Sequence, residues 1–377
     1  MALGEQDRQA VEQLARRFAQ DALAAVERED DRYPFAPWNR AAWRTAAELG
    51  LPGLALPESV GGSEQGLLTL ARALEIVARA EAGHATVLLT QALARATVVA
   101  LGPQSSAARW ATLRSDAQES LLAYPLYEDP EELGDGVRAR RDGAGFVLDG
   151  QLQQLSCLPI AQAVLVPALL VDSGEQAFFI LPTNTAGVSV SEPIVTLGLR
   201  ACPLADLTLA NVRVEAAGRL GGADAAAAYA RTAESYRPAL VAVALGVLSA
   251  SYDLAFAYAC ERKQSKRNIV LHHMVQEMLA GMASTLDLGA LTLERACQLA
   301  EQGGGSGTEL LSFQEVLCTL ITRVSTDGVQ VLGGNGYMHD YGQEKHMRDA
   351  KQLQTVLGSP TTRRLRILER RLARAQA

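Results

Sequence analysis

The sequence has few aromatic residues and no excess of basic residues, and these absences exclude whole classes of protein. Phe, Trp and Tyr make up 5% of the chain, and 35 Lys and Arg face 42 Asp and Glu, for a net charge of −7. A general nucleic-acid-binding protein needs basic surface and often stacking rings. With 48% hydrophobic residues in 377, the chain is also too apolar to be disordered. We therefore expect a globular protein of two or three subdomains and no nucleic-acid partner.

The cysteines are also few, and none is paired in sequence. They are an odd number, lie far apart and form no CxxC motif: Cys157, Cys202, Cys260, Cys297 and Cys318. This pattern indicates reduced, buried thiols rather than a disulfide framework or a metal site. The N-terminal segment lacks the charged-then-apolar layout of a signal peptide. We therefore expect a cytoplasmic protein without a bound metal.

No apolar run is long enough to predict a membrane span. The longest, Pro238 to Tyr252, is bounded by Asp253 and soon after by the charged residues 261–263. A span needs about 20 apolar residues, whereas this stretch suits a central core helix. We therefore expect no membrane partner.

The periodicity of the apolar residues divides the chain into three parts. Helical spacing fills the first third and returns after the Ala-rich stretch 223–230, whereas the middle contains short strand-like runs at 163–171, 178–181 and 207–214. Asp-Gly and Asp-Ser-Gly segments at 142–143, 149–150 and 172–174 read as turns. We predict a helical domain over 1–118, a β domain over 119–217 and a helical domain over 218–377. The absence of alternating strands and helices argues against a doubly wound dinucleotide fold.

A glycine cluster interrupts the last helical part. Gly333, Gly334 and Gly336 surround Asn335, three residues after Gln330. Glycines let a backbone approach a ligand closely, and a glutamine both donates and accepts hydrogen bonds. A loop that merely ends a helix is the alternative, and glycine count alone favours it.

Several segments resemble one flavoprotein family. Gln330 to Tyr337, which reads QVLGGNGY, followed by Met347 to Lys351, which reads MRDAK, resembles the C-terminal signature of acyl-CoA dehydrogenases. Ala257 to Gln264 is similar to that family's YA-x-ERxxFG segment. Further similar positions are Leu56-Pro57-Glu58, Gly61-Gly62, Gly198, Arg200 and the strand 207–214. The helix–sheet–helix order agrees, so the resemblance covers essentially the whole chain.

The resemblance implies a fold, a cofactor and a reaction. The fold is α+β, with an N-terminal helical domain, a central β-barrel-like domain and a C-terminal four-helix bundle, assembled as a dimer or a dimer of dimers. FAD is expected between the β domain and a helical domain, partly across a subunit interface. In that chemistry a buried carboxylate, whose pKa burial raises, removes the α proton of an acyl-CoA thioester while a hydride passes to the flavin. Electron-transfer flavoprotein or a similar acceptor is the implied electron partner.

One position departs from this chemistry. The family usually places the catalytic Glu directly before a Gly-Thr or Gly-Ser pair, and here Leu357 precedes Gly358 and Ser359. A leucine cannot accept a proton, so we predict no catalytic residue at this position. In relatives that carry the base on the long C-terminal helix, its place corresponds to Tyr236 here. Glu234 would point about 200° away around a helix, which makes it a poor substitute.

The segments expected to surround the flavin ring have changed more than those expected to bind ADP. Residues 122–130, which replace the family's TEPxAGSD, contain no Ser, Thr or Gly, and Gln154 replaces an aromatic ring near Ser156. Arg262 survives in the ERxxFG motif, although Ser265 and Lys266 replace its Phe and Gly. The residues that the resemblance implies in FAD binding are Arg262, Gln264, His272, Gln330, Gly333, Gly334, Ser156 and Ser359. For His272, an interface role without ligand contact is equally open.

These departures lead to three hypotheses. The first is that the chain is the base-lacking subunit of a heteromeric acyl-CoA dehydrogenase, such as a heterotetramer, and completes the FAD site of a homologous partner. Mixed pairs in this family handle bulky thioesters such as those of steroid side chains or ring acids. The second is a homomeric flavoenzyme with a relocated base, for which Glu234, Tyr236 and Tyr127 are the candidates. The third is a scaffold of the same fold that binds neither FAD nor acyl-CoA.

The C-terminal tail forms a basic amphipathic helix. It has six arginines between Arg363 and Arg374 against the single Glu369, and Leu365, Leu368 and Leu372 share one stripe. We expect a docked helix whose arginines face solvent or a partner carboxylate. Binding of CoA phosphates or nucleic acid by these arginines is the alternative. Arg363 also replaces a Gln of the family.

Overall fold

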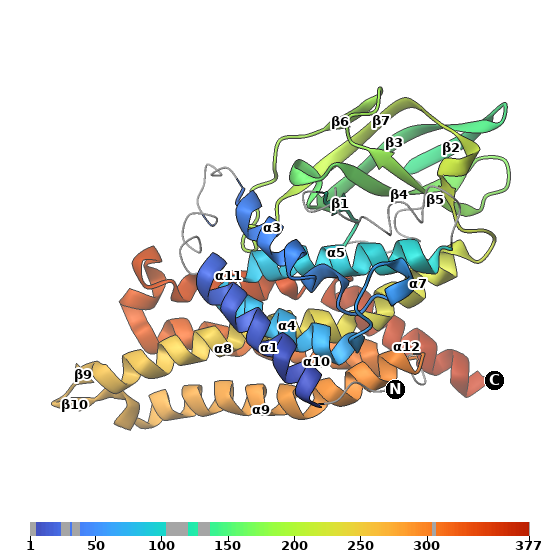
Figure 1. Cartoon of the computed structure of the whole chain (residues 1–377). Coiled ribbons are helices and arrows are strands. Elements are labelled where there is room, and N and C mark those ends of the chain that lie inside the picture. Colours follow the sequence, from blue (N-terminus) through green and yellow to red (C-terminus); the bar gives the residue numbers. More distant parts are fainter. Residues whose placement is uncertain are drawn as a thin grey trace.

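The chain contains two helical parts that are separated in sequence by a β-sheet (Figure 1). The helices of the two parts pack against each other, and the sheet lies on one side of them. The computed structural model describes residues 5–23, 31, 38–102, 120–126, 136–303 and 307–376. The predicted order of helices, strands and helices is confirmed. The domain limits stay predictions, and the first of them, at 118, lies outside the described residues.

The N-terminal part is helical, as predicted. It contains α1 (Glu5–Phe18), α3 (Arg40–Glu48), α4 (Gly66–Ala80) and α5 (Ala82–Ala100). The loop before α4, which contains Pro57 and Gly61, depends on Gly62, because a Cβ there would lie 2.1 Å from the backbone oxygen of Leu56. Helix α5 begins where the Glu81 side chain accepts a hydrogen bond from the backbone N–H of His84. Most of α5 is buried, and this helix lies between the sheet and the other helices (Figure 1).

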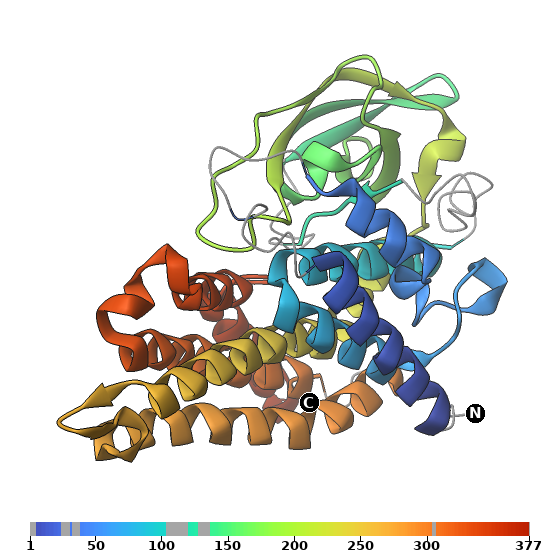
Figure 2. The ribbon, with the colours of Figure 1, turned by 60° about the vertical axis from the view of Figure 1, so that its left-hand side comes forward.

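The middle part is one mixed, curved sheet of eight strands (Figure 2). The strands run in the order β6-β7-β3-β2-β4-β5-β8, with β1 paired to β4. Their bounds are β1 Leu122–Ala123, β2 Val137–Asp142, β3 Gly145–Ser156, β4 Ala163–Leu170, β5 Gln176–Pro182, β6 Val188–Val190, β7 Leu204–Val214 and β8 Arg219–Leu220. The three predicted strand runs are thus confirmed as β4, β5 and β7.

One predicted turn is wrong. Asp149 and Gly150 lie inside β3, where the register with β7 shifts between Leu148 and Gly150. Gly150 has φ +136°, and a Cβ there would lie 2.1 Å from the Gly136 backbone oxygen. The Asp-Gly pair therefore makes a bulge that lets two backbones approach, rather than a chain reversal.

The C-terminal part consists of long helices around a central one. Its elements are α7 (Ala225–Ser235), α8 (Arg237–Glu261), β9 (Lys263–Gln264), β10 (Arg267–Asn268), α9 (His273–Glu301), α10 (Glu309–Leu332), α11 (Gln343–Leu353) and α12 (Pro360–Gln376). Helix α8 packs against α4, α9 and α10. The helical segment Ala225–Glu261 has an 18-residue window apolar enough to cross a bilayer, but 67% of that window is buried in the protein. The apolar stretch predicted as a core helix is therefore the centre of the bundle.

Helix α12 docks on the protein with the side opposite to the one its apolar stripe suggested. Arg363 is fully buried, whereas Leu365, Leu368 and Leu372 are each more than half exposed. Arg370 instead holds Glu234 on α7 with two hydrogen bonds of 2.7 and 2.9 Å. A docked helix with an arginine on a carboxylate was expected, but the exposed leucine stripe was not.

All five cysteines are free, and four of them are buried. The sulfur atoms of Cys157 and Cys202 lie 4.0 Å apart. Within the described ranges, no three His, Cys, Asp or Glu side chains gather in a way that could hold a metal ion.

Candidate functional site

Six of the eight predicted FAD-binding residues line one cleft. This bundle-end cleft, of about 900 Å³, lies where α8 ends, α9 begins and α10 ends. The six residues are Arg262, Gln264, His272, Gln330, Gly333 and Gly334. Residues distant in sequence thus come together where three helix ends and the β9–β10 hairpin meet (Figure 1).

The glycines shape the rim of the bundle-end cleft. Helix α10 stops after Leu332 because Gly333 takes φ +59°, a conformation that most side chains disfavour. A Cβ on Gly333 or Gly334 would meet nothing within 4 Å, so their backbone is open to a ligand. The glycine cluster therefore ends α10 and also leaves backbone groups open to the cleft. The two interpretations of the glycines, a helix end and a backbone that a ligand can approach, are compatible.

The hairpin beside the cleft keeps its turn although its motif has changed. Ser265 and Lys266 both have positive φ, +49° and +65°, between β9 and β10. A two-residue hairpin turn with two positive φ values normally uses glycine or asparagine. The backbone shape at the family's Phe-Gly position is thus retained with less suitable residues.

The polar groups of the bundle-end cleft suit an anionic, planar ligand. Arg262 is exposed and, among the residues described, makes no ion pair and no side-chain hydrogen bond. The His272 ring lies between the Arg267 guanidinium, at 3.1 Å, and the Gln264 backbone oxygen, at 3.4 Å. A free guanidinium recognises phosphate, and amide side chains beside open backbone can bind an adenine edge. The residues present therefore fit the ADP half of FAD.

Leu357, where the sequence predicts that the family's base is missing, lies outside this cleft, and its backbone is held by several hydrogen bonds. In the Leu357 loop, defined as residues 354–359, the Leu357 N–H donates to the Leu126 backbone oxygen at 2.8 Å. The Leu357 oxygen accepts from Arg237 at 2.9 Å, and the Val356 oxygen accepts from Gln314 at 2.7 Å. Arg363 donates to the Gly358 oxygen and, at 3.0 Å, to the Gln354 oxygen. Leu357 has φ +55°, and these contacts hold it in that unfavourable conformation.

Two buried arginines create this clasp on the Leu357 loop. Arg363 is completely buried and pairs with Glu315 at 3.0 Å. Arg237, 5% exposed, bonds Gln314 but has no carboxylate partner among the described residues. Burial lowers its pKa to about 10. Two arginine side chains therefore hold the backbone oxygens of the Leu357 loop, and the loop presents no carboxylate that could accept a proton.

None of the described substitute bases is available for proton abstraction. Glu234 is engaged by Arg370. Tyr236 is 6% exposed, and its burial raises the pKa of the hydroxyl far above the ordinary value, so it remains protonated. Tyr127 lies outside the described residues.

The two predicted serines differ in their surroundings. Ser156 exchanges backbone hydrogen bonds of 3.2 and 3.0 Å with Tyr124, yet its buried Oγ has no partner in the described part of the chain. Such an orphaned hydroxyl fits a flavin atom as its missing partner. The Ser359 hydroxyl instead accepts from the Thr362 N–H at 3.1 Å and caps α12. Contact of either serine with FAD stays a prediction.

The bundle-end cleft and the Leu357 loop lie near opposite ends of α10. Gln314, which binds the loop, and Gln330, which lines the cleft, are both on α10. Sixteen residues of helix separate them by about 24 Å, at roughly 1.5 Å per residue. Figures 1 and 2 show the β9–β10 hairpin far from the sheet.

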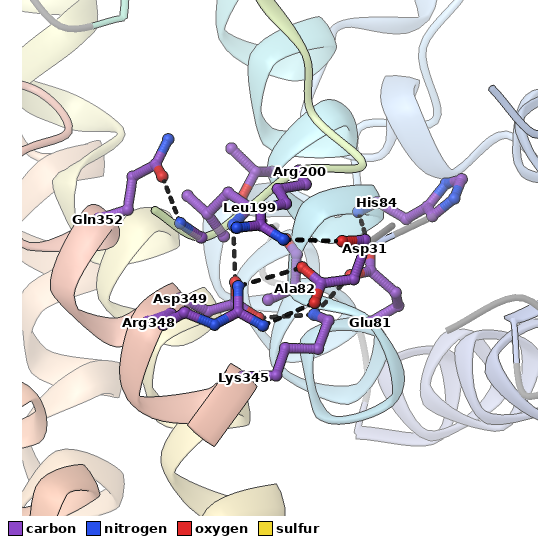
Figure 3. Close-up of polar contacts among 12 residues, drawn as sticks. Asp31, Glu81, Ala82, His84, Leu199, Arg200, Lys345, Arg348, Asp349 and Gln352 are labelled. Carbon is purple, nitrogen blue, oxygen red and sulfur yellow. Dashed lines mark hydrogen bonds and ion pairs between the residues drawn. The ribbon is translucent and has the colours of Figure 1, made fainter. Parts of the chain in front are cut away.

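A buried cluster of charges joins the three parts of the chain (Figure 3). Lys345 on α11 binds Glu81, at the start of α5, at 2.8 Å and Asp349 at 2.6 Å. Asp349 accepts from the Leu199 N–H at 2.6 Å, and Arg348 binds Asp31 at 2.6 Å. We call Asp31, Glu81, Lys345, Arg348 and Asp349 the junction cluster. It fixes α11, which leads directly into the Leu357 loop.

The charges of the junction cluster are strongly coupled. Burial raises the pKa of Glu81, but the Lys345 ammonium and the hydrogen bond from His84 outweigh it and lower the value from 4.5 to about 2. Burial raises the pKa of Asp349 despite the same ammonium. The pKa of Lys345 is raised by its two carboxylates, which outweigh its burial. In the sequence, MRDAK marked part of the cluster only as a family signature, and nothing singled out Asp31 or Glu81.

Comparisons with known proteins agree with the whole architecture. The family profile "Acyl-CoA dehydrogenase, N-terminal domain" matches residues 5–112, and "Acyl-CoA dehydrogenase, C-terminal domain" matches 224–372. Cyclohexane-1-carbonyl-CoA dehydrogenase of Geobacter metallireducens is 30% identical over 327 residues, 84% of this chain and 85% of that protein. Probable acyl-CoA dehydrogenase YngJ of Bacillus subtilis is 27% identical over 374 residues, 95% and 96% of the two chains.

A solved structure confirms the fold. Butyryl-CoA dehydrogenase from Megasphaera elsdenii superposes with a TM-score of 0.88 at 23% identity, over 97% of each chain. The predicted arrangement of an N-terminal helical domain, a central β domain and a C-terminal helical bundle is therefore correct.

Proposed function

Because this chain belongs to the acyl-CoA dehydrogenase family, we propose that it is the base-lacking subunit of a heteromeric acyl-CoA dehydrogenase. Members of the family are FAD-dependent oxidoreductases that act on CoA thioesters. The main support for the proposal is the contrast between the bundle-end cleft and the Leu357 loop. The six residues suited to ADP form an open cleft, whereas Leu357 replaces the base and is clasped by Leu126 and Arg237.

In this proposal the bundle-end cleft completes a site that begins on a homologous partner. Arg262 binds the pyrophosphate, and Gln330 with the open backbone at Gly333 and Gly334 holds the nucleotide end of the partner's FAD. When bound, FAD supplies the acceptor for the hydride of the thioester. The partner supplies the Glu, because the described residues of this chain offer no free base near Leu357.

The proposed substrate is a bulky acyl-CoA, such as a ring acid or steroid side-chain thioester. The relative from Geobacter metallireducens, a cyclohexane-1-carbonyl-CoA dehydrogenase, supports a cyclic acyl group. We further propose a cytoplasmic heterotetramer that passes its electrons to an electron-transfer flavoprotein or a similar acceptor.

One observation favours a second candidate, a homomeric flavoenzyme. The orphaned hydroxyl of Ser156 is what a flavin ring in this chain's own β domain would satisfy. That alternative needs a base outside the described residues, since Glu234 is paired and Tyr236 is protonated.

An absorbance spectrum tests the proposal directly. The chain is purified alone and after co-expression with an acyl-CoA dehydrogenase chain of the same organism that retains Glu before its Gly-Thr or Gly-Ser pair. We expect a colourless chain alone and a yellow mixed complex that bleaches on addition of its acyl-CoA. A chain that is yellow alone and bleaches with substrate would establish the homomeric enzyme, and a chain colourless in both states would be a scaffold.

A further inference from the structure

Two buried thiols meet where the ladder between β3 and β7 ends. Ser156 on β3 pairs with Leu204 on β7, and beyond that pair the Cys157 N–H donates to the Pro203 backbone oxygen at 2.9 Å. Cys202 directly precedes Pro203, and the sulfur atoms of Cys157 and Cys202 lie 4.0 Å apart. Both cysteines are buried, with 0 and 1% of their surface exposed. The two thiols are therefore in contact, about 2 Å further apart than the sulfur atoms of a disulfide.

The other three cysteines are not placed in this way. Cys297 and Cys318 are as deeply buried and Cys260 is half-buried, but none of them contacts a second cysteine within the described part of the chain. A buried free cysteine ordinarily serves as a small apolar side chain. Two in contact differ, because they can lose two hydrogens and join without placing a charge in the core. In the reducing cytoplasm proposed for this chain, disulfides that do form are usually transient or redox-sensing.

The surroundings of the pair determine which oxidant can reach it. The hydrogen bond with Cys157 and burial raise the pKa of the Cys202 thiol well above its ordinary value, so Cys202 stays protonated. Cys157 is therefore the thiol that reacts first. It has φ +64°, which is uncommon for a residue other than glycine, and it lies at a strand end. Local opening of such an end admits a small, uncharged molecule sooner than a bulky reagent.

We propose that Cys157 and Cys202 are a redox-active pair that hydrogen peroxide converts into a disulfide. The Cys157 sulfur attacks one peroxide oxygen, the O–O bond breaks, and the thiol proton leaves with the second oxygen as water. The Cys202 sulfur then attacks the Cys157 sulfenic acid, its S–O bond breaks, and the hydroxyl leaves with the Cys202 proton as a second water. In total the two thiols lose two electrons, and one peroxide is reduced to two waters.

The oxidant is one that flavin chemistry can supply. A reduced flavin that reacts with dioxygen releases hydrogen peroxide, so a flavin-linked assembly can itself produce the molecule that oxidises the pair. The inference does not depend on the proposed heteromeric function, because this chain alone carries both thiols.

The disulfide would tie β3 to a segment that a helix already holds. In this segment, residues 198–203, the Leu199 N–H donates to Asp349 on α11 at 2.6 Å. The two cysteines are 45 residues apart in the chain. A cross-link stabilises a protein mainly by restricting its unfolded chain, and the effect grows with the length of the closed loop. Oxidation should therefore raise the unfolding temperature of the chain by several degrees.

Counting thiols on the full chain tests the pair. The reduced protein is treated with hydrogen peroxide, unfolded in urea with excess N-ethylmaleimide, and weighed by mass spectrometry. Five thiols should be labelled before treatment and three after it, because two of the five have joined. Digestion should release one linked pair of peptides that contains Cys157 and Cys202. Dithiothreitol should restore all five labelled thiols and the lower unfolding temperature.

Two variants separate the pair from general thiol chemistry. Cys202→Ala and Cys318→Ala each remove a thiol that is 1% exposed. The Cys202→Ala chain should form no disulfide, dimedone should label the sulfenic acid at Cys157, and peroxide should not raise the unfolding temperature. The Cys318→Ala chain should still lose two thiols, from four to two. Cys157→Ala, which should also form no disulfide, replaces Cys202→Ala if that chain does not fold.

Four outcomes would overturn the inference. Five labelled thiols after peroxide treatment would show that the pair is inert, and a linked peptide pair that contains Cys260 would place the reaction on a more accessible thiol. Sulfinic acid at Cys157 with Cys202 still labelled would show that the two thiols cannot join. Loss of two thiols in Cys202→Ala would likewise exclude the pair. None of these outcomes depends on flavin content, so the inference and the proposed function can fail separately.

Discussion

The bundle-end cleft and the Leu357 loop sit at opposite ends of α10, and they differ in how their polar groups are used. In the cleft, Arg262 and the backbone of Gly333 and Gly334 are open to a ligand. In the loop, the polar groups of Leu357 are bonded by Leu126 and Arg237. An open set of donors can bind something from outside the chain, whereas a satisfied set has only a structural role.

On the proposed function, this difference shows how a fold can retain only one half of a binding site. In an assembly where a cofactor spans two chains, each half evolves under its own constraint. On the proposed function, a change at the Leu357 end of α10 leaves the binding groups at the other end of the helix, about 24 Å away at roughly 1.5 Å per residue, physically unaffected. Five changes to the protein test this contrast.

The largest effect should come from moving the base. Changing the partner's Glu to Gln should lower turnover of the mixed complex by about 10²–10⁴-fold, because general base catalysis is lost. Leu357→Glu in this chain should not restore it, since Arg237 would pair with the new carboxylate and hold its pKa low. Stopped-flow bleaching of the flavin with acyl-CoA measures both. Recovered turnover in the double variant would show that the Leu357 loop is still a competent site.

Breaking the clasp should cost stability. Arg363→Ala removes the buried guanidinium that bonds Glu315 and the Gly358 and Gln354 backbone oxygens, while Arg364 still pairs with Glu315 at 2.6 Å, and it should lower the free energy of unfolding by about 1–3 kcal/mol. Urea unfolding of the chain measures it, with the exposed Arg371→Ala as the control, expected within about 0.5 kcal/mol of the unchanged protein. Equal effects of the two changes would mean that the clasp is incidental.

Acid should lower the free energy of unfolding through the junction cluster, which fixes the helix that leads into the Leu357 loop. Since the pKa of Glu81 falls from 4.5 to about 2 on folding, its contribution to stability is present above pH 4.5 and is lost as the pH falls towards 2. Its size is about 3 kcal/mol. The raised pKa of Asp349 acts in the opposite direction, so the comparison is made with Glu81→Gln. Urea unfolding at pH 7, 4.5 and 3 should show the two proteins converging as the pH falls, and parallel curves would contradict this.

A substitution in the bundle-end cleft should weaken flavin binding and leave the stability of the chain unchanged. Arg262→Ala removes the free guanidinium and should weaken flavin binding by the mixed complex about tenfold, or about 1.4 kcal/mol. Thermal unfolding of the chain alone should be unchanged. Arg231→Ala, which removes an exposed arginine paired with Asp224 on α7, is the control. Flavin content equal in the two variants would place the ADP elsewhere.

The smallest effect should come from the hairpin beside the cleft. Lys266 has φ +65°, where glycine is relaxed, so Lys266→Gly should stabilise the chain by about 0.5–1 kcal/mol. Flavin content should stay the same, because Lys266 does not line the cleft. Denaturant unfolding measures the stability. A loss of flavin would give this lysine a binding role.

The cofactor-binding residues could be predicted from the sequence only in part. Arg262, Gln330 and the glycines could be found because each lies in a contiguous motif, and a motif keeps its local shape. That they form one cleft with Gln264 and His272 follows from three helix ends meeting, which sequence spacing does not encode. Glu81 and Asp31 could not be found, since their partners lie more than 260 residues away in the chain.

The helix–sheet–helix order, the core helix α8 and the absence of a carboxylate at position 357 could all be read from the sequence alone. Apolar periodicity and residue chemistry are local properties, so they can be read without a fold. The tertiary structure decided which side of α12 is docked. It turned Arg363 inward because Glu315 and two backbone oxygens were there to receive its charge, and so left Leu365, Leu368 and Leu372 exposed. A helical stripe states only which residues share a face, and the surface packed against the helix determines which face is buried.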